Sequence, residues 1–372
     1  MPLTGCNPVT SQNNTFSMES LVRKELPAFK PYTPGEQPGL STSTIKLNTN
    51  ENPYPPSPKI KEAVEKVLQT GVLRKYPNYH ARKLQELIAK DYDLDPNQIL
   101  VTNGSDEALR MLFHTLVGPG DVVVAPDPTY SYYPVLTEQM MVGAIYKAVP
   151  LLPNLHFDFE SLLKEKGKLL CFAHPNAPTG VEEEKEKLLS LVKNFSGVVL
   201  SDEAYIDFTE PNTSLISEIK NHPNLVVSRT FSKSYALAGL RVGYLVGSID
   251  VITWIRKLKD SYNVGILEQV IAEASFADKE YFLEKRSLVI QERTKLKIEL
   301  ETLGFTLPNS STNFLFCKPK QGISPESLYL QLKEKNILIR YFSTGISKDY
   351  IRITIGTPEE NQKLLETIRT LL

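Results

Sequence analysis

The sequence predicts an α/β protein whose large domain holds a mostly parallel, seven-stranded sheet flanked by helices. Seven short apolar runs lie between residues 99 and 246, and segments with helical periodicity separate most of them. Charged helical segments follow over 251–303, and no Gly or Pro interrupts 276–303, which predicts one long helix. The remainder alternates between strand and helix patterns. We therefore expect a smaller α+β C-terminal domain, joined to the large one by that helix.

The individual elements are predicted from runs of apolar residues and from amphipathic patterns. The strands of the large domain are expected over 99–102, 121–125, 144–149, 168–173, 197–202, 225–227 and 242–246. Those of the small domain are expected over 313–317, 337–341 and 350–355. Helices are expected over 59–69, 81–90, 108–117, 182–193 and 325–335.

Four segments are expected along the chain. Residues 1–17 are polar, rich in Asn, Ser and Thr, and lack the apolar stretch of a secretory signal, so we expect either a disordered tail or residues added by an upstream start codon. Residues 18–52 contain four prolines and are expected to form an extended arm that packs with the small domain. The large domain would then span 53–265, and the small domain 266–372.

The composition excludes several classes of partner. The 372 residues carry 42 basic and 43 acidic side chains, so bulk charge directs the chain to neither nucleic acid nor membrane surfaces. No stretch approaches the roughly 20 apolar residues that span a bilayer. Cys6, Cys171 and Cys317 lie far apart and form neither a metal-ligand spacing nor a disulfide framework. We therefore expect no metal and a reducing, cytoplasmic location.

Polar side chains follow the expected strands at the points where these strands end. Such positions are occupied by Ser105, Tyr130, Asn176, Asp202 and Lys233. In open α/β sheets, ligands bind outside the carboxyl ends of the strands. We therefore expect these five side chains to surround one site.

Two short segments at these strand ends suggest chemistry. Lys233 stands between two serines, and a lysine whose pKa is lowered by burial can form a Schiff base, although a single Lys is more often exposed. The segment Gly104-Ser105-Asp106 opens a helix, so its free backbone amides suit a phosphate group. The alternative is that Ser105 or Asp106 only caps the helix.

These residues match the requirements of pyridoxal 5'-phosphate. The cofactor needs a lysine for its aldehyde and a carboxylate that keeps its ring nitrogen protonated. It also needs a partner for its phenolic oxygen and donors for its phosphate. Lys233, Asp202 and Tyr205 can fill the first three roles. The phosphate donors would be Gly104, Ser105, Asp106, Ser232 and Arg241.

Seven motifs resemble the fold-type-I aminotransferases, and within them the histidinol-phosphate aminotransferase family. They are Leu-Asn-Thr-Asn-Glu-Asn-Pro-Tyr (47–54), Tyr-Pro (76–77), Asn-Gly-Ser-Asp-Glu (103–107), Pro-Asn-Ala-Pro-Thr-Gly (175–180), Ser-Asp-Glu-Ala-Tyr (201–205), Phe-Ser-Lys-Ser-Tyr-Ala-Leu-Ala-Gly-Leu-Arg (231–241) and Ile-Arg-Ile-Thr-Ile-Gly-Thr (351–357). The resemblance runs from about residue 26 to the C-terminus. It implies transamination between L-histidinol phosphate and 2-oxoglutarate, which gives imidazole-acetol phosphate and L-glutamate in histidine biosynthesis.

The resemblance also implies roles for single residues. Lys233 would hold the cofactor covalently and carry the proton that leaves the substrate Cα, while Asp202 and Tyr205 would hold the cofactor ring. Tyr130 would stack on that ring, and Tyr76 would reach the phosphate bound by a neighbouring subunit. The family therefore implies a homodimer with shared active sites. The substrates would be bound by Tyr32, Asn52, Arg340 and Arg352.

The sequence departs from the family's pattern at one position. In much of the superfamily an Asn directly before Pro-Thr-Gly contacts the phenolic oxygen, and here Ala177 stands there. Asn176, one residue earlier, would replace it, or Tyr205 would act alone.

Three alternatives share much of this sequence pattern. An aromatic-amino-acid aminotransferase and a threonine-phosphate decarboxylase would carry nearly the same cofactor residues. A non-catalytic, ligand-sensing module on the same fold would have lost the lysine or gained a DNA-binding segment. Lys233 is present and no helix-turn-helix extension is visible, so we favour an enzyme.

Overall fold

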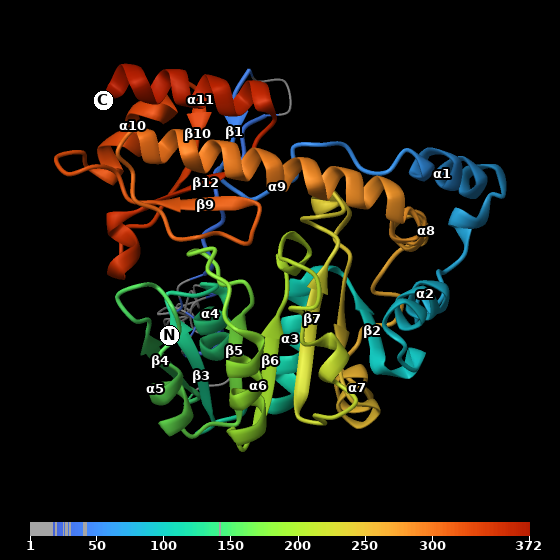
Figure 1. Ribbon diagram of the computed structural model, residues 1–372. Coiled ribbons are helices and arrows are strands. Elements are labelled where there is room, and N and C mark those ends of the chain that lie inside the picture. Colours follow the sequence, from blue (N-terminus) through green and yellow to red (C-terminus); the bar gives the residue numbers. More distant parts are fainter. Residues whose placement is uncertain are drawn as a thin grey trace, which may run out of the picture. The chain divides into compact units, whose positions relative to one another are not determined.

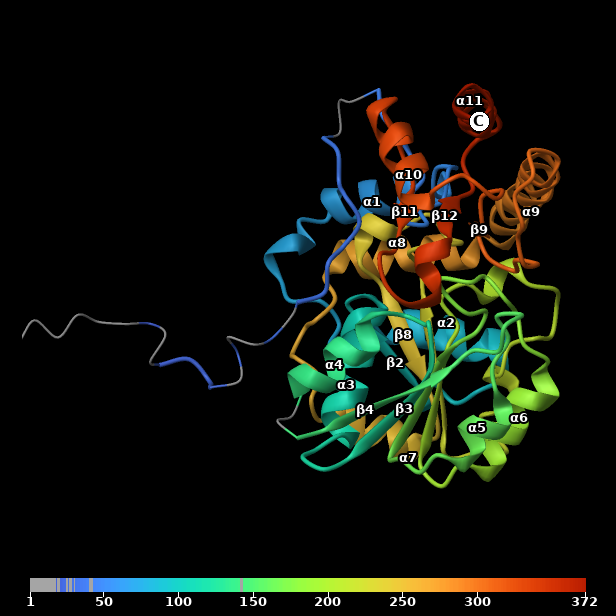
Figure 2. The same ribbon diagram turned by 90° about the vertical axis from the view of Figure 1, so that its left-hand side faces the viewer.

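The computed structural model describes residues 18, 21–24, 26, 29, 31–39, 43–140 and 143–372, the side chains of 139 and 140 excepted (Figures 1 and 2). The tail expected over residues 1–17 lies outside the described residues. The chain separates into two compact units, Met1–Pro31 and Tyr32–Leu372. All helices and strands described below belong to the second unit.

A seven-stranded sheet forms the centre of the large lobe. Its strands, in spatial order, are β2 (Ile99–Thr102), β8 (Gly243–Val246), β7 (Leu225–Thr230), β6 (Val198–Asp202), β5 (Leu169–Ala173), β3 (Val122–Asp127) and β4 (Ile145–Pro150). Only β8 runs antiparallel to its neighbours, so the expected mostly parallel sheet is confirmed. The central strands are buried, which explains why their sequences read as continuous apolar runs.

Helices cover both faces of this sheet, and each face has its own apolar core. One core includes side chains of α2 (Arg82–Tyr92), α5 (Phe159–Lys164), α6 (Lys185–Asn194) and α8 (Ile266–Ala277). The other includes side chains of α3 (Gly104–Leu116), α4 (Tyr132–Met140) and α7 (Ile249–Arg256). Figure 2 shows α3 and α4 on one side of the strands and α5 and α6 on the other. Helix α1 (Lys59–Gln69) packs against α8.

A smaller lobe is built around the antiparallel sheet β11-β12-β9. Its elements are β9 (Phe314–Cys317), α10 (Pro325–Glu334), β10 (Ile337–Leu338), β11 (Arg340–Tyr341), β12 (Ile351–Thr354) and α11 (Pro358–Leu371). The expected single strand over 337–341 is wrong, because β10 and β11 belong to two different sheets. Strand β10 pairs in parallel with β1 (Ile45–Lys46), so the described end of the expected arm lies on this lobe.

The long helix that joins the lobes begins later than its sequence suggests. Helix α8 ends at Ala277, and α9 (Lys279–Thr302) starts after a break at Asp278. The Asp278 carboxylate accepts hydrogen bonds from Ser57 Oγ at 2.6 Å and from Lys59 Nζ at 2.7 Å. Figure 1 shows α9, in orange, beside β9 and below α11. Side chains of α8 belong to an apolar core of the large lobe. The domain boundary expected at residue 265 stays a prediction.

Candidate active site

A cavity of about 480 Å³ opens where the strands of the large sheet end and the small lobe begins. The sheet contributes Ala173 and Asp202, and the small lobe contributes side chains of β11 and β12. Eight of the residues expected at the site line this cavity: Tyr32, Ser105, Tyr130, Asp202, Tyr205, Lys233, Arg340 and Arg352. The predicted convergence of the strand ends is therefore present for most, but not all, of the residues.

Lys233 follows the exit of β7 and projects into the cavity. Its Nζ donates to the carbonyl oxygen of Thr49 at 3.3 Å and lies 5.8 Å from the centre of the Tyr205 ring. No carboxylate forms an ion pair with this amine among the described residues. The amine is thus available to a ligand in the cavity.

Asp202, the last residue of β6, is a buried carboxylate with one of its two oxygens satisfied. Oδ2 accepts a hydrogen bond from the Tyr133 hydroxyl at 3.0 Å. Oδ1 is buried without a hydrogen-bond partner among the described residues. Burial raises the pKa of Asp202 to about 7, although the hydrogen bond from Tyr133 opposes this shift. A cationic N–H donor bound beside Oδ1 would satisfy this oxygen and favour the ionised form.

The Tyr205 hydroxyl is positioned by an arm residue that the sequence analysis did not single out. Asn50 Nδ2 donates to the Tyr205 hydroxyl oxygen at 2.8 Å. The Asn50 side chain is held in turn, because its Oδ1 accepts from the Thr354 hydroxyl at 3.2 Å. Asn50 adopts a left-handed backbone with φ of 56°, a conformation that Asn tolerates better than most residues. The Asn-rich segment 48–52 was the available signal for it.

Arg241 contacts both the N-terminus of α3 and the segment that carries Lys233. Arg241 donates from Nη2 to Asp106 Oδ2 at 3.0 Å and from Nη1 to Ser232 Oγ at 3.4 Å. Gly104 has a φ of 77°, and a Cβ built on it would lie 2.5 Å from Arg241 Nη2. Free amides at the start of this helix, a hydroxyl and a guanidinium suit a phosphate group.

Two arginines of the small lobe face each other across the strand pair β11-β12 and line the cavity. Arg340 and Arg352 are direct partners in the antiparallel register. Among the described residues, Arg340 donates to the carbonyl oxygens of Thr33 and Pro34 at 3.2 and 3.3 Å, and Arg352 Nη2 donates to the carbonyl oxygen of Asn48 at 3.2 Å. Neither guanidinium is paired with a carboxylate in the described part of the chain, and Arg352 Nε is buried without a partner. The pair is therefore suited to an anionic ligand.

Comparison with known proteins identifies the family. The model of the family "Aminotransferase class I and II" matches residues 42–368. The chain belongs to this family. A histidinol-phosphate aminotransferase of Syntrophus aciditrophicus is 39% identical over 362 residues, which cover 95% of this chain and 98% of the relative. One of Acinetobacter baylyi is 40% identical over 357 residues, which cover 94% and 96%. The resemblance that the motifs indicate is confirmed.

Solved structures show the same aminotransferase fold. The histidinol-phosphate aminotransferase of Clostridium acetobutylicum has a TM-score of 0.82 at 24% identity, over 88% of this chain and 98% of that one. The L-threonine-O-3-phosphate decarboxylase of Porphyromonas gingivalis has a TM-score of 0.74 at 23% identity, over 88% and 99%. The backbone fold alone therefore does not choose between these two activities.

Seven residues expected at the aminotransferase site do not line the cavity in this chain: Asn52, Tyr76, Gly104, Asp106, Asn176, Ser232 and Arg241. Gly104 and Asp106 flank Ser105, which does line the cavity, and Arg241 contacts Asp106 and Ser232. Asn176 is buried, and its amide donates to Pro128 O and Thr179 Oγ1 while its Oδ1 accepts from Thr129. Both N–H donors of this amide are used, so none is left for the phenolic oxygen of a cofactor, and the proposed replacement for the family's Asn is not supported here. Its role is to join two loops at the strand ends.

Asn52 and Tyr76 lie elsewhere as well. Asn52 Nδ2 donates to the carbonyl oxygens of Lys233 and Ser234, each at 3.1 Å, so it supports the lysine segment and does not face a substrate. Tyr76 is 80% exposed and stacks on Tyr262, with ring centres 4.5 Å apart. A contact of Tyr76 with a cofactor would require a second subunit.

Proposed function

We propose that this chain is a pyridoxal-phosphate-dependent aminotransferase that exchanges an amino group between L-histidinol phosphate and 2-oxoglutarate. The products are imidazole-acetol phosphate and L-glutamate, a step of histidine biosynthesis. Relatives at 39–40% identity over most of their length carry the corresponding name. The observation that carries the proposal is one cavity holding an unpaired lysine amine, a half-satisfied buried carboxylate and two guanidiniums without carboxylate partners.

The donor set of the cavity fits the cofactor. Asp202 Oδ1 lacks the N–H donor that a protonated pyridine nitrogen supplies. Tyr205, held by Asn50, would donate to the phenolic oxygen. The amides at the start of α3, with Ser105, Ser232 and Arg241, would hold the phosphate. When bound, the cofactor withdraws electrons from the substrate Cα and makes its proton acidic.

The chain's own groups would orient the substrate and move its proton. Lys233 Nζ would take the proton from the substrate Cα. This amine lines the cavity without an ion pair, and unlike the guanidiniums of Arg340 and Arg352 it can lose its proton and act as a base. Thr49 O holds Nζ through a single hydrogen bond, which leaves the amine free to move. Tyr32 and Tyr130, whose rings lie edge to face at 6.2 Å, would exclude water above the reacting atoms.

Arg340 and Arg352 would bind the anionic groups of both substrates. In one half-reaction the anion is a carboxylate of glutamate or 2-oxoglutarate, and in the other it is the phosphate of histidinol phosphate. A guanidinium binds each of them with forked hydrogen bonds. The two arginines therefore account for why one site accepts two substrates that differ in the rest of their structure.

Steady-state kinetics test the substrate assignment. The purified protein, loaded with pyridoxal phosphate, is given 2-oxoglutarate with histidinol phosphate, phenylalanine or threonine phosphate. We expect the highest kcat/KM with histidinol phosphate. A higher kcat/KM for phenylalanine would favour an aromatic-amino-acid aminotransferase. Carbon dioxide release from threonine phosphate without turnover of histidinol phosphate would favour the decarboxylase.

The assembly is part of this proposal. We propose a homodimer in which Tyr76 of each subunit reaches the phosphate end of the other site, because its ring is exposed and does not line the chain's own cavity. Sedimentation analysis of the wild-type protein is expected to give a dimer. In Tyr76→Phe, which keeps the ring, we expect about tenfold weaker cofactor binding, the loss of one hydrogen bond to a charged group. A monomeric protein, or unchanged binding, would contradict this part.

The proposed cellular location follows from the proposed substrates. We propose that the enzyme works in the cytoplasm, where 2-oxoglutarate and histidine precursors are handled. None of the described helices has the length and apolar character needed to cross a membrane. Cell fractionation with an antibody to the chain tests the location.

A further inference from the structure

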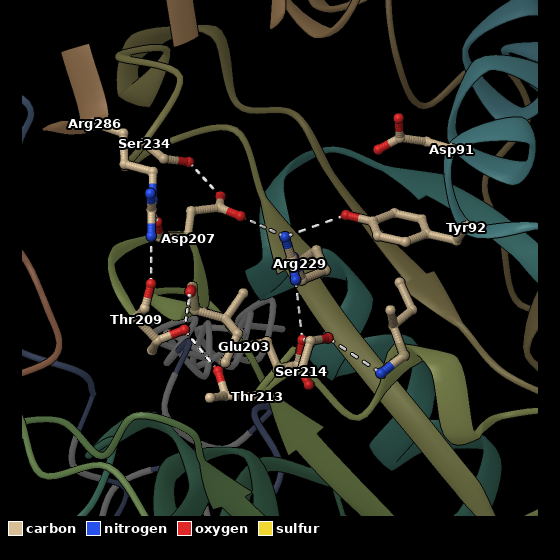
Figure 3. A network of polar contacts seen from close by, with 12 residues as sticks. Asp91, Tyr92, Glu203, Asp207, Thr209, Thr213, Ser214, Arg229, Ser234 and Arg286 are labelled. Carbon is tan, nitrogen blue, oxygen red and sulfur yellow. Dashed lines mark hydrogen bonds and ion pairs between the residues drawn. The ribbon is translucent and has the colours of Figure 1, made fainter. Parts of the chain in front are cut away.

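A buried polar network connects the segments that carry Asp202 and Lys233 (Figure 3). Its centre is Arg229, near the end of β7, whose side chain is only 7% exposed. Arg229 donates from Nη1 to Glu203 Oε2 at 3.0 Å and from Nη2 to Asp207 Oδ1 at 2.6 Å. Nη2 also donates to the Tyr92 hydroxyl oxygen at 3.2 Å. None of these four residues lines the cavity.

The network reaches the two site segments through neighbouring residues in the sequence. Glu203 directly follows Asp202, and Asp207 comes two residues after Tyr205. The second oxygen of Asp207, Oδ2, accepts a hydrogen bond from Ser234 Oγ, and Ser234 directly follows Lys233. The guanidinium of Arg229 thus connects the residues that follow β6 with the end of β7, through side chains that do not line the cavity.

Every charge in the network is satisfied, at a considerable desolvation cost. Glu203 is 1% exposed, and its Oε1 accepts from the backbone amide of Leu215 at 2.7 Å. Two carboxylates and one guanidinium at such depth are stable only with complete hydrogen bonding, and apolar side chains of similar volume often stabilise a fold as well or better. A gain in folding stability therefore explains this buried network poorly. A requirement that its side chains and the segments they join keep a fixed geometry explains it better.

The backbone of the same loop is held from α9 as well. Arg286 donates from Nε to the carbonyl oxygen of Asp207 and from Nη2 to that of Thr209. Asn52 holds the opposite segment through the carbonyl oxygens of Lys233 and Ser234. The backbone of each segment is thus held by a side chain from another part of the chain, and the Asp207–Ser234 hydrogen bond joins the two segments directly.

We infer that Arg229, Asp207 and Ser234 form a positioning network that fixes Lys233 Nζ relative to Asp202 and Tyr205, and so sets kcat without contact to substrate or cofactor. The inference rests on the proposed function, since it assumes that Lys233 moves the substrate proton. A shift of about 1 Å in a reacting group can cost on the order of 100-fold in rate. The network should therefore affect kcat strongly and KM weakly.

Three variants separate the effect of a lost hydrogen bond on kcat from the effect of a lost charge. Ser234→Ala removes one hydrogen bond and no charge, Asp207→Asn removes a negative charge, and Arg229→Gln removes a positive one. In each we expect kcat per bound cofactor to fall by about tenfold or more, with KM within about twofold, because geometry is lost and substrate contacts are kept. The Ser234 variant is the mildest and keeps the test usable should Arg229→Gln fail to fold.

The absorbance of the cofactor–lysine linkage gives a readout independent of turnover. Loss of the Asp207 charge should lower the pH at which this absorbance titrates, and loss of the Arg229 charge should raise it, since a nearby anion favours the protonated linkage. A network that only supports the fold would leave this midpoint unchanged. Hydrogen exchange of the backbone amides of 231–237 in the cofactor-free protein gives a second readout, and we expect faster exchange in all three variants.

Glu183→Gln is the matched control. Glu183 is 5% exposed in the same lobe, and its carboxylate accepts from the amide of Phe157 at 2.8 Å and contacts His156 Nδ1 at 3.0 Å, outside the network. We expect this variant to lose thermal stability but to keep kcat per bound cofactor, the titration midpoint and the exchange of 231–237.

Each outcome decides between the network and the proposed function. If the three variants behave as Glu183→Gln does in all readouts, the network inference is overturned. If the wild-type protein shows no linkage absorbance, or Lys233→Ala retains it, the proposed function fails. In that case, hydrogen exchange of the backbone amides of 231–237 in the cofactor-free protein still tests whether the network fixes the lysine segment.

Discussion

Tyr133 donates its hydroxyl to Asp202 Oδ2 at 3.0 Å, while Asp202 Oδ1 is buried in the same carboxylate without a partner. The two residues come from α4 and β6, so the contact also ties a helix of one sheet face to the strand that ends at the cavity. One oxygen is fixed by the protein and the other is left for a ligand. This asymmetry explains why a buried carboxylate can be retained at the wall of the cavity.

Removal of the Tyr133 hydroxyl is expected to weaken cofactor binding. In Tyr133→Phe the ionised form of Asp202 loses the hydrogen bond that lowers its pKa, so this pKa should rise further. A hydrogen bond to a charged group contributes roughly 1.5–3 kcal/mol, so we expect at least about tenfold weaker binding of pyridoxal phosphate at pH 8. Fluorescence titration of the cofactor-free protein with pyridoxal phosphate measures this affinity. Tyr132→Phe, one residue away, should bind normally, and equal affinities in the two variants would count against the role of Tyr133.

The stability of the cofactor-free protein should depend on pH through Asp202. Burial raises the pKa of this carboxyl from 3.8 to about 7 in the folded state, so the unfolded chain releases the proton first as pH rises. The contribution to the free energy of unfolding is neutral below pH 4, becomes unfavourable between pH 4 and 7, and is constant above pH 7. It reaches about 4 kcal/mol at most, because one pH unit of pKa shift corresponds to roughly 1.4 kcal/mol.

Asp202→Asn removes this dependence and provides its test. Denaturant unfolding of the two cofactor-free proteins should give a more stable variant at pH 8 and equal stabilities near pH 4. The same difference at both pH values would show that ionisation of Asp202 is not its cause. The variant should also bind the cofactor less tightly, since a neutral amide stabilises a cationic ring nitrogen less than a carboxylate does.

Gly104 is expected to be intolerant of a side chain. In Gly104→Ala the new Cβ would displace the Arg241 guanidinium from its present place and would sit on a left-handed backbone, which costs about 1–2 kcal/mol by itself. We expect about tenfold weaker cofactor binding in this variant, because the guanidinium no longer lies at the phosphate end. Gly239→Ala is the control, since a Cβ there meets no atom within 4 Å. Similar losses in both would argue against a phosphate site beside Arg241.

Arg352 should control the use of both substrates. Arg352→Ala removes a guanidinium whose Nε has no hydrogen-bond partner in the described part of the chain. We expect kcat/KM to fall about 100-fold for histidinol phosphate and for glutamate, because charge-assisted, bidentate pairs are lost. Cofactor affinity should stay unchanged. Arg369→Ala, which breaks a surface ion pair with Glu299 in the same lobe, should remain within about twofold. A loss confined to one substrate would contradict a shared anion site.

The sequence was most informative where periodicity and burial agree. Each of the seven strands of the large sheet was expected within a few residues of its place, because a strand buried on both faces requires an apolar run. The end of β10 was missed because the apolar run Ile337–Ile339 continues past it, and nothing in the pattern shows the change of sheet. The break at Asp278 was missed for a similar reason. No Gly or Pro marks it, and its carboxylate is held by Ser57 and Lys59, more than 200 positions away.

The candidate site was predicted from strand ends and motifs. The residues whose roles were missed or misassigned are those whose roles depend on tertiary contacts. Tyr133 lies in a run of tyrosines, and only the fold shows which of them reaches Asp202. Asn176 was expected at the cofactor from its position beside Ala177, but the loops that it joins use both N–H donors of its amide. Arg229 was not predicted to have a role, because the partners of its guanidinium come from separate parts of the chain.

The most direct test of the account is the position of the cofactor on the chain. The protein loaded with pyridoxal phosphate is reduced with borohydride, digested, and analysed by peptide mass spectrometry. The account predicts the pyridoxyl mass on the peptide that contains Lys233 and on no other lysine. The same mass on a different lysine, or no covalent label at all, would contradict it.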